Sequence, residues 1–195
     1  MRIFVFNEGD FLAYKKQQLN EARGEIVRLD PYWGRAQISV FISHRHDDLE
    51  DLRGIIGFLE SQYNVKCYID SRDPSLPKTT SGETARRIKG RIEGCKKFIL
   101  LATEGAIDSK WCNWELGYGD AKKFKDHIAI FPLKKKGTSE FTYKGYEYLQ
   151  IYPAITYYSQ GETYKGGSPI TPGYYVREQS EDSSYITPLA DWLNK

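Results

Sequence analysis

The sequence predicts an α/β protein built around a parallel sheet, because short apolar strands alternate along the chain with helices that have one apolar face. Three runs carry this expectation: residues 37–43 (QISVFIS), 98–102 (FILLA) and 128–133 (IAIFPL). Each is nearly continuous in apolar residues, which is typical of a strand covered on both faces of a sheet. We therefore expect a central parallel sheet of about five strands flanked by helices.

The first helix and the second strand follow directly from the first apolar run. A helix is predicted from about residue 47 to residue 63, with Asn64 as its end. Its apolar residues recur at steps of three and four, which gives one core-facing stripe. The stripe consists of Leu49, Leu52, Ile56, Leu59 and Tyr63. Residues 65–69 (VKCYI) then predict the second strand.

Residues 70–81 (DSRDPSLPKTTS) predict a long exposed loop, because prolines and small polar residues continue neither a strand nor a helix. Thr80 followed three residues later by Glu83 resembles a capping box. We expect a helix to begin there, and its inward-facing residues to be Ala85, Ile88 and Ile92.

The third strand, residues 98–102, is the most apolar and is expected to lie at the centre of the sheet. Asp108 or Ser109 is expected to cap the helix that follows. The predicted inner stripe of that helix is Trp114, Tyr118 and Ala121. Residues 128–133 form the fourth predicted strand, and the proline within it suits a strand end.

The two ends of the chain are predicted to extend this unit. Residues 8–23 have the composition of a helix that ends at Gly24, so we assign residues 1–36 to an N-terminal helical extension. The main domain spans residues 37–195 and includes an elaboration over residues 141–195, which hold ten of the fifteen tyrosines. Within it, residues 145–158 predict a fifth strand with flanking turns, and residues 186–193 predict a closing helix.

Charge and cysteine content argue against several classes of function. The 195-residue chain carries 28 Lys and Arg against 26 Asp and Glu, and its basic residues are scattered, so nothing predicts nucleic-acid binding. The three cysteines, an odd number without a CxxC pair, predict reduced core thiols and no metal site. The N-terminal apolar run is short, and no apolar segment of about 18 residues exists, which predicts a cytoplasmic protein without a membrane anchor.

Glu115 is the most informative single residue, because its neighbours leave its charge without a partner. No basic residue lies three or four positions away, so the usual helical ion pair is unavailable. Trp111 lies one turn earlier, which places its ring beside the carboxylate on one helix face. A carboxylate against aromatic surface is costly unless it has a use. The simpler interpretation is a solvated helical glutamate, and the rest of the chain argues against it.

The predicted topology places Glu115 near a ligand site. In an open parallel sheet, ligands bind at the carboxyl ends of the strands, which gathers residues 43–47, 70–81 and 103–111 around it. The helix start after the first strand offers backbone N–H groups that suit a phosphate. A carboxylate with aromatic walls suits glycosidic chemistry at a ribose, where an oxocarbenium-like centre needs a nearby anion.

Other chemistries have less support from the residue types. His44 and His46, with His127 far away in the sequence, make a poor metal-ligand pattern. Ser43 lacks the GxSxG elbow of a hydrolase nucleophile, so a strand-terminal turn is its expected role. Cys112 begins a helix, which can lower a thiol pKa, but we expect it to be a packing residue. No GxGxxG or P-loop motif follows the first strand, which argues against a dinucleotide cofactor and a P-loop kinase.

Four segments together resemble the Toll/interleukin receptor (TIR) domain family, and specifically its standalone bacterial branch. They are FISHRHDD (41–48), CYIDSRDPSLP (67–77), CKKFILLAT (95–103) and SKWCNWELGYGDA (109–121). The pattern SxWCxxEL in the last segment is the sharpest, and GYEYLQIYP (145–153) is similar to the tail of the same branch. The resemblance implies a flavodoxin-like sheet of about five parallel strands.

The resemblance also implies an activity. Catalytic members cleave the nicotinamide–ribose bond of NAD+, which is a substrate, and no other cofactor is implied. Glu115 falls on the catalytic glutamate, which would hold the ribose hydroxyls and stabilise the developing ribosyl cation. Trp111 falls on the aromatic residue that stacks against the nicotinamide end, while Ser43 and His44 would line the first-strand side. Arg45 replaces the usual serine there and changes the polarity expected at the substrate mouth.

Partners follow from the same resemblance. Asp73 and Pro74 would belong to a loop through which catalytic members pack head to tail against a second protomer. Standalone bacterial forms resemble the signal-producing half of Thoeris-type antiphage systems, whose ADP-ribose-derived second messenger activates a separate effector protein. Two alternatives stay open. One is a non-catalytic interaction module that assembles through residues 70–81, and the other is a ribosyl-transfer enzyme acting on nucleosides or nucleotides.

Overall fold

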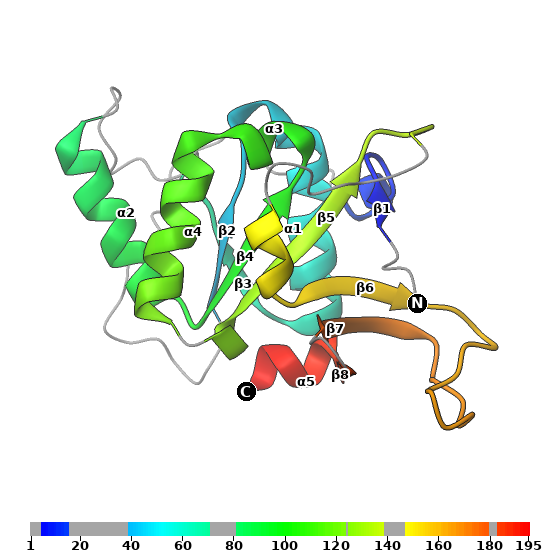
Figure 1. Cartoon of the computed structure of the whole chain (residues 1–195). Helices are drawn as coiled ribbons and strands as arrows, with labels where there is room; N and C mark the ends of the chain where they lie inside the picture. Colours follow the sequence, from blue (N-terminus) through cyan, green and yellow to red (C-terminus); the bar gives the residue numbers. More distant parts are fainter. Residues whose placement is uncertain (1–4, 16–38, 71–80, 124, 139–146, 180–182) are drawn as a thin grey trace.

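The computed structural model describes residues 5–15, 39–70, 81–123, 125–138, 147–179 and 183–195. Within these residues, a twisted sheet lies between two layers of helices (Figure 1). Helices α2 (Gly82–Gly94) and α4 (Lys110–Lys122) cover one face of the sheet. Helices α1 (Leu49–Tyr63) and α5 (Leu189–Asn194) cover the other. The predicted α/β architecture is therefore confirmed.

The parallel part of the sheet has the strand order β3-β2-β4-β5-β6. Its strands are β2 (Ser39–Ser43), β3 (Lys66–Tyr68), β4 (Lys97–Ala102), β5 (Ile128–Lys134) and β6 (Ala154–Tyr158). Counted from β2, this is the 2-1-3-4-5 order of flavodoxin-like sheets. The most apolar run, β4, lies in the middle of this order, as its sequence predicted.

Side-chain alternation along the strands creates two separate cores. Phe41 faces α2 and α4, and its ring stacks on Phe98 with the ring centroids 5.4 Å apart. Its neighbours Val40 and Ile42 face α1 on the opposite side of the sheet. Because successive residues of a strand point to opposite faces, Ser43 returns to the α4 side at the carboxyl end of β2.

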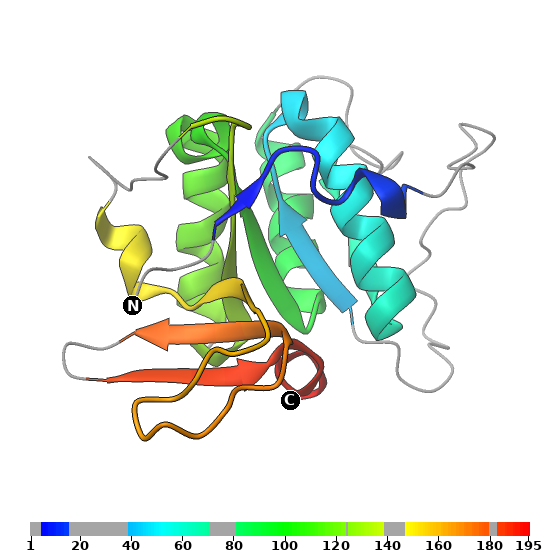
Figure 2. The ribbon, with the colours of Figure 1, turned by 90° about the vertical axis from the view of Figure 1, so that its right-hand side faces the viewer.

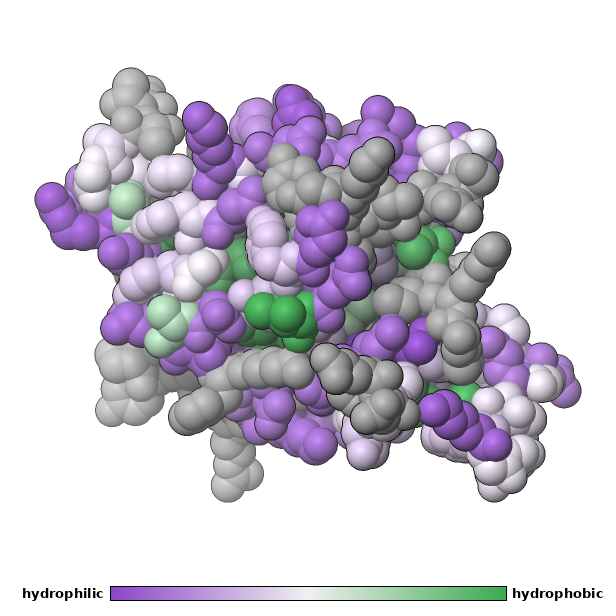
Figure 3. Space-filling model, in the orientation of Figure 1, coloured by the Kyte–Doolittle hydropathy of each residue, from purple (hydrophilic) through white to green (hydrophobic). Residues whose placement is uncertain are grey.

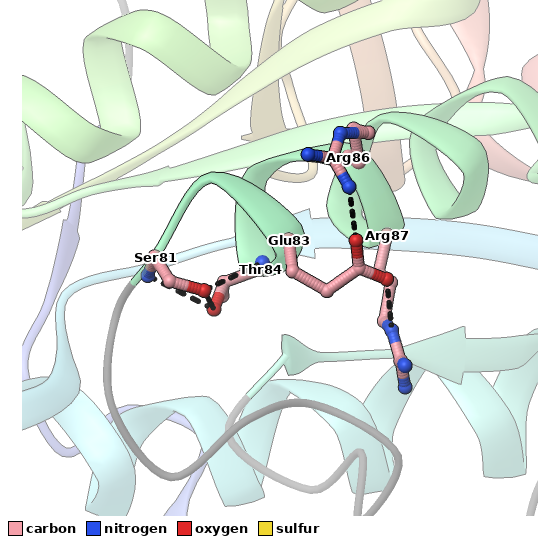
Figure 4. Close-up of polar contacts among 5 residues, drawn as sticks. All are labelled: Ser81, Glu83, Thr84, Arg86 and Arg87. Carbon is pink, nitrogen blue, oxygen red and sulfur yellow. Dashed lines mark hydrogen bonds and ion pairs between the residues drawn. The ribbon is translucent and has the colours of Figure 1, made fainter.

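Helix α2 begins with a capping box that lies one residue further along the chain than predicted (Figure 4). Ser81 Oγ accepts a hydrogen bond from the Thr84 backbone N–H, and Thr84 Oγ1 accepts one from the Ser81 N–H. The predicted partner Glu83 instead forms ion pairs with Arg86 and Arg87 on the outer face of the helix. Thr80, the predicted cap, lies outside the described residues.

The N-terminal helix predicted over residues 8–23 is wrong for the part that the structure describes. Residues 6–7 form β1, which pairs in parallel with β5, and residues 12–14 form the 3-10 helix η1. Phe6 and Phe11 are buried in the core on the α1 side of the sheet, and this long-range packing overrides the helix propensity of residues 8–15. Figure 2 shows the segment, in blue, running across α1. The rest of the predicted helix lies outside the described residues.

Helix α1 is adapted to this N-terminal segment by two glycines. A methyl group at Gly54 would lie 2.6 Å from the Phe11 carbonyl oxygen, and one at Gly57 would overlap the Tyr14 carbonyl oxygen. The Gly9 backbone N–H also donates a 2.6 Å hydrogen bond to Asp51 Oδ1. The backbone of the N-terminal segment therefore packs directly against the helix backbone.

Gly57→Ala is expected to destabilise the chain by about 1–3 kcal/mol, because the added methyl group must displace the N-terminal segment. Gly90→Ala is a matched control. Gly90 lies on α2, and a methyl group added there would have no other atom within 4 Å, so alanine should stabilise that helix by about 0.5–1 kcal/mol. Urea unfolding of the two variants measures the contrast. Equal unfolding midpoints would contradict the tight packing of residues 9–14 on α1.

The C-terminal elaboration adds an antiparallel extension to the sheet that the sequence did not predict. Strands β7 (Gly173–Gln179) and β8 (Ser184–Pro188) continue the sheet beyond β6 (Figure 2). The fifth strand was predicted within residues 145–158 and is confirmed as β6. The closing helix predicted over residues 186–193 starts only at Leu189, because residues 186–188 pair with β7 as part of β8.

Within the described residues, three further 3-10 helices and one short α-helix connect these elements. They are η2 (His46–Asp48), α3 (Glu104–Asp108), η4 (Lys125–His127) and η5 (Glu147–Ile151). The hydroxyl of Tyr148 on η5 donates to Asn113 Oδ1, which ties η5 to α4. The side chain of Ile151 is 57% exposed, and Figure 3 shows apolar surface near η5 within a mainly hydrophilic face.

Candidate active site

Glu115 is buried at the carboxyl end of the parallel strands. It lies on α4, whose first turn is capped by Ser109 Oγ accepting from the Cys112 backbone N–H. The Glu115 residue is only 2% exposed, and its Oε2 accepts a 2.6 Å hydrogen bond from Ser43 Oγ at the end of β2. The structure therefore brings together two of the predicted site residues that are 72 positions apart in the sequence.

The inner face of α4 differs from the predicted one. Ala121 is exposed, and Trp114 and Tyr118 are only partly buried. The positions that face the sheet are Cys112, Glu115, Leu116 and Gly119. A methyl group at Gly119 would lie 3.2 Å from the Phe98 ring, so this glycine lets the helix approach β4 closely. The predicted stripe followed the largest aromatic residues, whereas the helix turns its small residues and the carboxyl toward the sheet.

Burial raises the pKa of Glu115 from 4.5 to about 8. The nearby charge of Asp70 contributes to this rise in pKa, while the hydrogen bond from Ser43 and the indole of Trp111 favour the charged form. The second carboxylate oxygen, Oε1, has no hydrogen-bond partner of normal geometry among the described residues. Such an orphaned acceptor is costly in a folded protein, and it is best satisfied by a cationic or hydrogen-bonding ligand.

Trp111 lies one turn before Glu115 on α4, as predicted from their spacing. Its indole is close enough to lower the pKa of the Glu115 carboxyl, and the ring is partly buried. The Trp111 ring centroid is 4.9 Å from that of Trp114, and Trp114 in turn stacks with Tyr118. Lys89 on α2 lies over the Tyr118 ring at 4.7 Å. Trp114 and Tyr118 thus lie next to Lys89 of α2, and Trp111 is the member of the row beside the carboxyl.

His44 lies next to Ser43 and is also buried. Its Nδ1 is 3.3 Å from the Ile42 carbonyl oxygen and 3.8 Å from Asp70 Oδ1. Burial lowers the pKa of His44, although the charges of Asp70 and Asp48 raise it in part. Asp70 was not singled out from the sequence. The only signal in the sequence was its position directly after the second predicted strand.

Arg45 points to different partners from those of Ser43 and His44. Its guanidinium forms a 2.9 Å ion pair with Asp47, and its side chain lies against Gly105 on α3. The side chain is half exposed, so its predicted role at the substrate mouth stays a prediction. The adjoining helix start carries Asp47 and Asp48. Their negative charges would repel a phosphate, so they argue against the phosphate-binding position expected there.

Several predicted features stand apart from this cluster. Asp73 and Pro74 lie outside the described residues. Burial raises the pKa of the Cys112 thiol to about 11, so this thiol is neutral and packs beside Glu115. Across the described ranges, no group of three or more His, Cys, Asp or Glu residues is arranged to hold a metal ion. None of the helices described has both the length and the apolar character needed to cross a bilayer.

The fold and this site define a member of one family. A flavodoxin-like sheet carries a buried glutamate on the helix after its central strand, with the SxWCxxEL pattern around it. Residues 40–158 match the family model of the TIR domain. The chain therefore belongs to the TIR domain family, as its motifs indicated.

A curated relative supports the same assignment. The chain is 34% identical over 164 residues to a protein of Bacillus cereus (strain MSX-D12) named probable 3' cyclic ADP-D-ribose synthase ThsB'. The match covers 77% of this chain and 82% of the relative. It therefore includes most of both proteins.

Proposed function

We propose that this TIR domain cleaves the nicotinamide–ribose bond of NAD+ and closes the ADP-ribose moiety into a cyclic product. The observation that carries the proposal is the buried Glu115 carboxyl, which Ser43 holds at one oxygen while the other has no partner of normal geometry in the described part of the chain. The name of the Bacillus relative, a probable cyclic ADP-D-ribose synthase, supports the reaction type. A purely structural interaction module gains nothing from burying such a carboxyl.

The charge of Glu115 matches the charge that develops during this reaction. When nicotinamide leaves, the positive charge of its ring moves to the ribosyl carbon, which becomes oxocarbenium-like. A carboxylate already desolvated and fixed in place stabilises that charge without reorganisation. The cationic nicotinamide ring of the substrate favours the ionised form, so binding of this ring beside Glu115 lowers the pKa of the carboxyl from about 8 toward its ordinary range.

The neighbouring residues take supporting roles. Ser43 fixes the carboxyl through Oε2, so that Oε1 is left to interact with the ribose. Trp111 offers an aromatic surface beside the carboxyl, where the planar nicotinamide ring can stack. Arg45 is half exposed near the same strand end and supplies a positive charge for the pyrophosphate once it leaves Asp47.

The biological role extends the proposal. The product serves as a second messenger of a Thoeris-type antiphage system and activates a separate effector protein. Self-association through the loop that contains Asp73 and Pro74 completes the active assembly. Hydrolysis to linear ADP-ribose is the competing outcome, since water and a ribose hydroxyl differ only in which oxygen reaches the ribosyl carbon.

Incubation of the purified full chain with NAD+, followed by chromatography and mass spectrometry, tests the proposal. We expect release of nicotinamide together with a product that has the mass of ADP-ribose minus one water. Equal amounts of nicotinamide and linear ADP-ribose would show a hydrolase instead of a cyclase. Absence of nicotinamide at high protein concentration, where self-association is favoured, would contradict the proposed activity.

Ser43→Ala is expected to lower the rate of nicotinamide release about 10–100-fold at neutral pH, because it removes a buried hydrogen bond to a charged group. That bond favours ionised Glu115, so its loss also moves the rising limb of the pH–rate profile toward higher pH. Ser39→Ala at the other end of β2 is the matched control, since Ser39 Oγ accepts a hydrogen bond from the Lys96 backbone N–H and lies beside the Cys95 thiol, at the opposite end of the strand from Glu115. Indistinguishable pH–rate profiles for the two variants would contradict this role of Ser43.

A further inference from the structure

Two consecutive residues at the end of β2 each lie beside a carboxylate, but the proposed reaction has so far used only one of them. Ser43 contacts Glu115, whereas His44 Nδ1 lies 3.8 Å from Asp70 Oδ1. The His44 side chain is 2% exposed and that of Asp70 is 29% exposed. A buried histidine oriented by an aspartate, at the carboxyl ends of parallel strands, has the arrangement of a general base.

The tautomer of His44 follows from its backbone partner. The Ile42 carbonyl oxygen lies 3.3 Å from Nδ1, and a carbonyl oxygen can only accept a hydrogen bond. Nδ1 therefore carries the proton, and Nε2 carries the lone pair that can accept another. The Asp70 carboxylate lies on the Nδ1 side, where it stabilises the imidazolium that forms when Nε2 is protonated.

Asp70 also connects His44 to Glu115. The register of β2 and β3 pairs Phe41 with Tyr68, so two residues further on Asp70 reaches the level of Ser43. The charge of Asp70 raises the pKa of both His44 and Glu115, which places it within electrostatic reach of both side chains. His44 and Asp70 therefore lie at the carboxyl ends of β2 and β3, next to Ser43, which holds Glu115.

The proposed reaction requires a base in its second half. Nicotinamide leaves with both electrons of the C–N bond, and the ribosyl carbon then bonds to an acceptor oxygen. That oxygen belongs to a ribose hydroxyl in cyclisation through a 3' position and to water in hydrolysis. Either acceptor must give up its proton as the C–O bond forms, and a positioned side chain speeds this transfer. Glu115 is already engaged with the ribosyl cation and with Ser43.

We propose that His44 is the general base for the ribose hydroxyl that accepts the ribosyl carbon in cyclisation, and that Asp70 positions it. His44 Nε2 takes the proton of the acceptor hydroxyl while the oxygen bonds to the ribosyl carbon, and it later releases that proton to water. Nothing besides NAD+ is consumed, so atoms and charges balance. This inference rests on the proposed NAD+ cleavage and assigns the residues that serve its second half.

The electrostatics of His44 suit this role. Desolvation lowers its pKa below 6.5, which keeps the imidazole neutral and basic near neutral pH. The facing groups are Asp70 after β3, Asp48 at the start of α1 and His46 on η2; the two aspartates raise the pKa and His46 lowers it. Formation of the cyclic product should therefore rise with pH as His44 loses its proton.

The ratio of cyclic product to nicotinamide isolates this step. Ionisation of Glu115 affects bond cleavage and so changes both quantities together, whereas the acceptor base affects how the ribosyl cation is trapped. We would measure both products from NAD+ between about pH 5 and pH 8. His44→Gln is expected to lower the ratio roughly tenfold or more and to flatten its pH dependence. The matched control His46→Gln removes an exposed histidine two residues away. It is expected to keep the ratio at high pH and to shift its pH dependence only slightly upward, because His46 lowers the pKa of His44.

A second pair of variants tests Asp70 as a positioning residue. Asp70 raises the pKa of His44. In Asp70→Asn, the ratio of cyclic product to nicotinamide is therefore expected to begin its rise at lower pH and to level off at a lower value. A purely structural role would not shift the pH of this rise. Asp126→Asn is the control, since Asp126 is an exposed aspartate just before β5, at the amino end of that strand and so at the opposite end from Asp70.

The outcomes separate this inference from the proposed function. If the wild-type chain releases nicotinamide and His44→Gln keeps both the ratio and its pH dependence, His44 is not the base, while NAD+ cleavage stands. If the wild-type chain releases no nicotinamide, this result contradicts both the proposed function and this inference. If His44→Gln does not fold, as judged by its circular dichroism, Asp70→Asn provides the test. If its ratio of cyclic product to nicotinamide rises at the same pH as in the wild-type chain, the proposal is overturned.

Discussion

Glu115→Gln is expected to abolish nicotinamide release, with a fall in kcat of about a thousandfold, while the chain keeps its fold. The amide is nearly the same size as the carboxyl and can still accept the hydrogen bond from Ser43 Oγ. It cannot supply the negative charge that a ribosyl cation requires. Chromatographic assay of nicotinamide under saturating NAD+ measures the loss, and circular dichroism checks the fold.

The control for this variant is a glutamate on the neighbouring helix that is exposed. Glu93 lies on α2, is exposed and contacts Tyr118 on α4, so Glu93→Gln changes the same helix pair without touching the buried carboxyl. We expect Glu93→Gln to retain the wild-type kcat. A Glu115→Gln variant with more than about a tenth of the wild-type rate would mean that transition-state stabilisation resides elsewhere.

The core of the fold was predictable because its signals are local. The apolar runs that became β2, β4 and β5 are buried on both faces, so their composition alone identifies them. Glu115 was found in the same way, since the absence of a helical partner and the preceding tryptophan are visible within one turn. The carboxyl-end rule then placed Ser43 near it, and the 2.6 Å hydrogen bond confirms that proximity.

The features that were missed depend on contacts between distant segments. Phe11 belongs to a stretch with helical composition, but its burial against α1 decides the conformation. Strand β8 pairs with β7 across a short connection, and its polar residues give no continuous apolar signal. Asp70 becomes notable only when the register of β2 and β3 brings it level with Ser43. None of these relations is encoded by periodicity within one element.

Glu115 should also make the protein less stable as the pH rises. Burial raises its pKa in the folded state to about 8, whereas the unfolded chain has the ordinary value near 4.5. The folded state therefore holds the proton more tightly, so this contribution to stability is complete below the unfolded pKa and is lost as pH rises toward the folded pKa. At about 1.4 kcal/mol per pKa unit, the loss across this window is roughly 3–5 kcal/mol.

Urea unfolding of the wild-type chain and Glu115→Gln at several pH values between about 5 and 8 measures this contribution. We expect the two free energies of unfolding to diverge steadily, with the variant more stable by a few kcal/mol at the upper end. Taking the difference removes the opposite trend from His44, whose lowered pKa penalises the folded state at low pH. Parallel curves would mean that Glu115 ionises as it does in water. A divergence would show that burying the Glu115 carboxyl destabilises the free protein. Binding of the cationic nicotinamide ring would then offset that loss of stability.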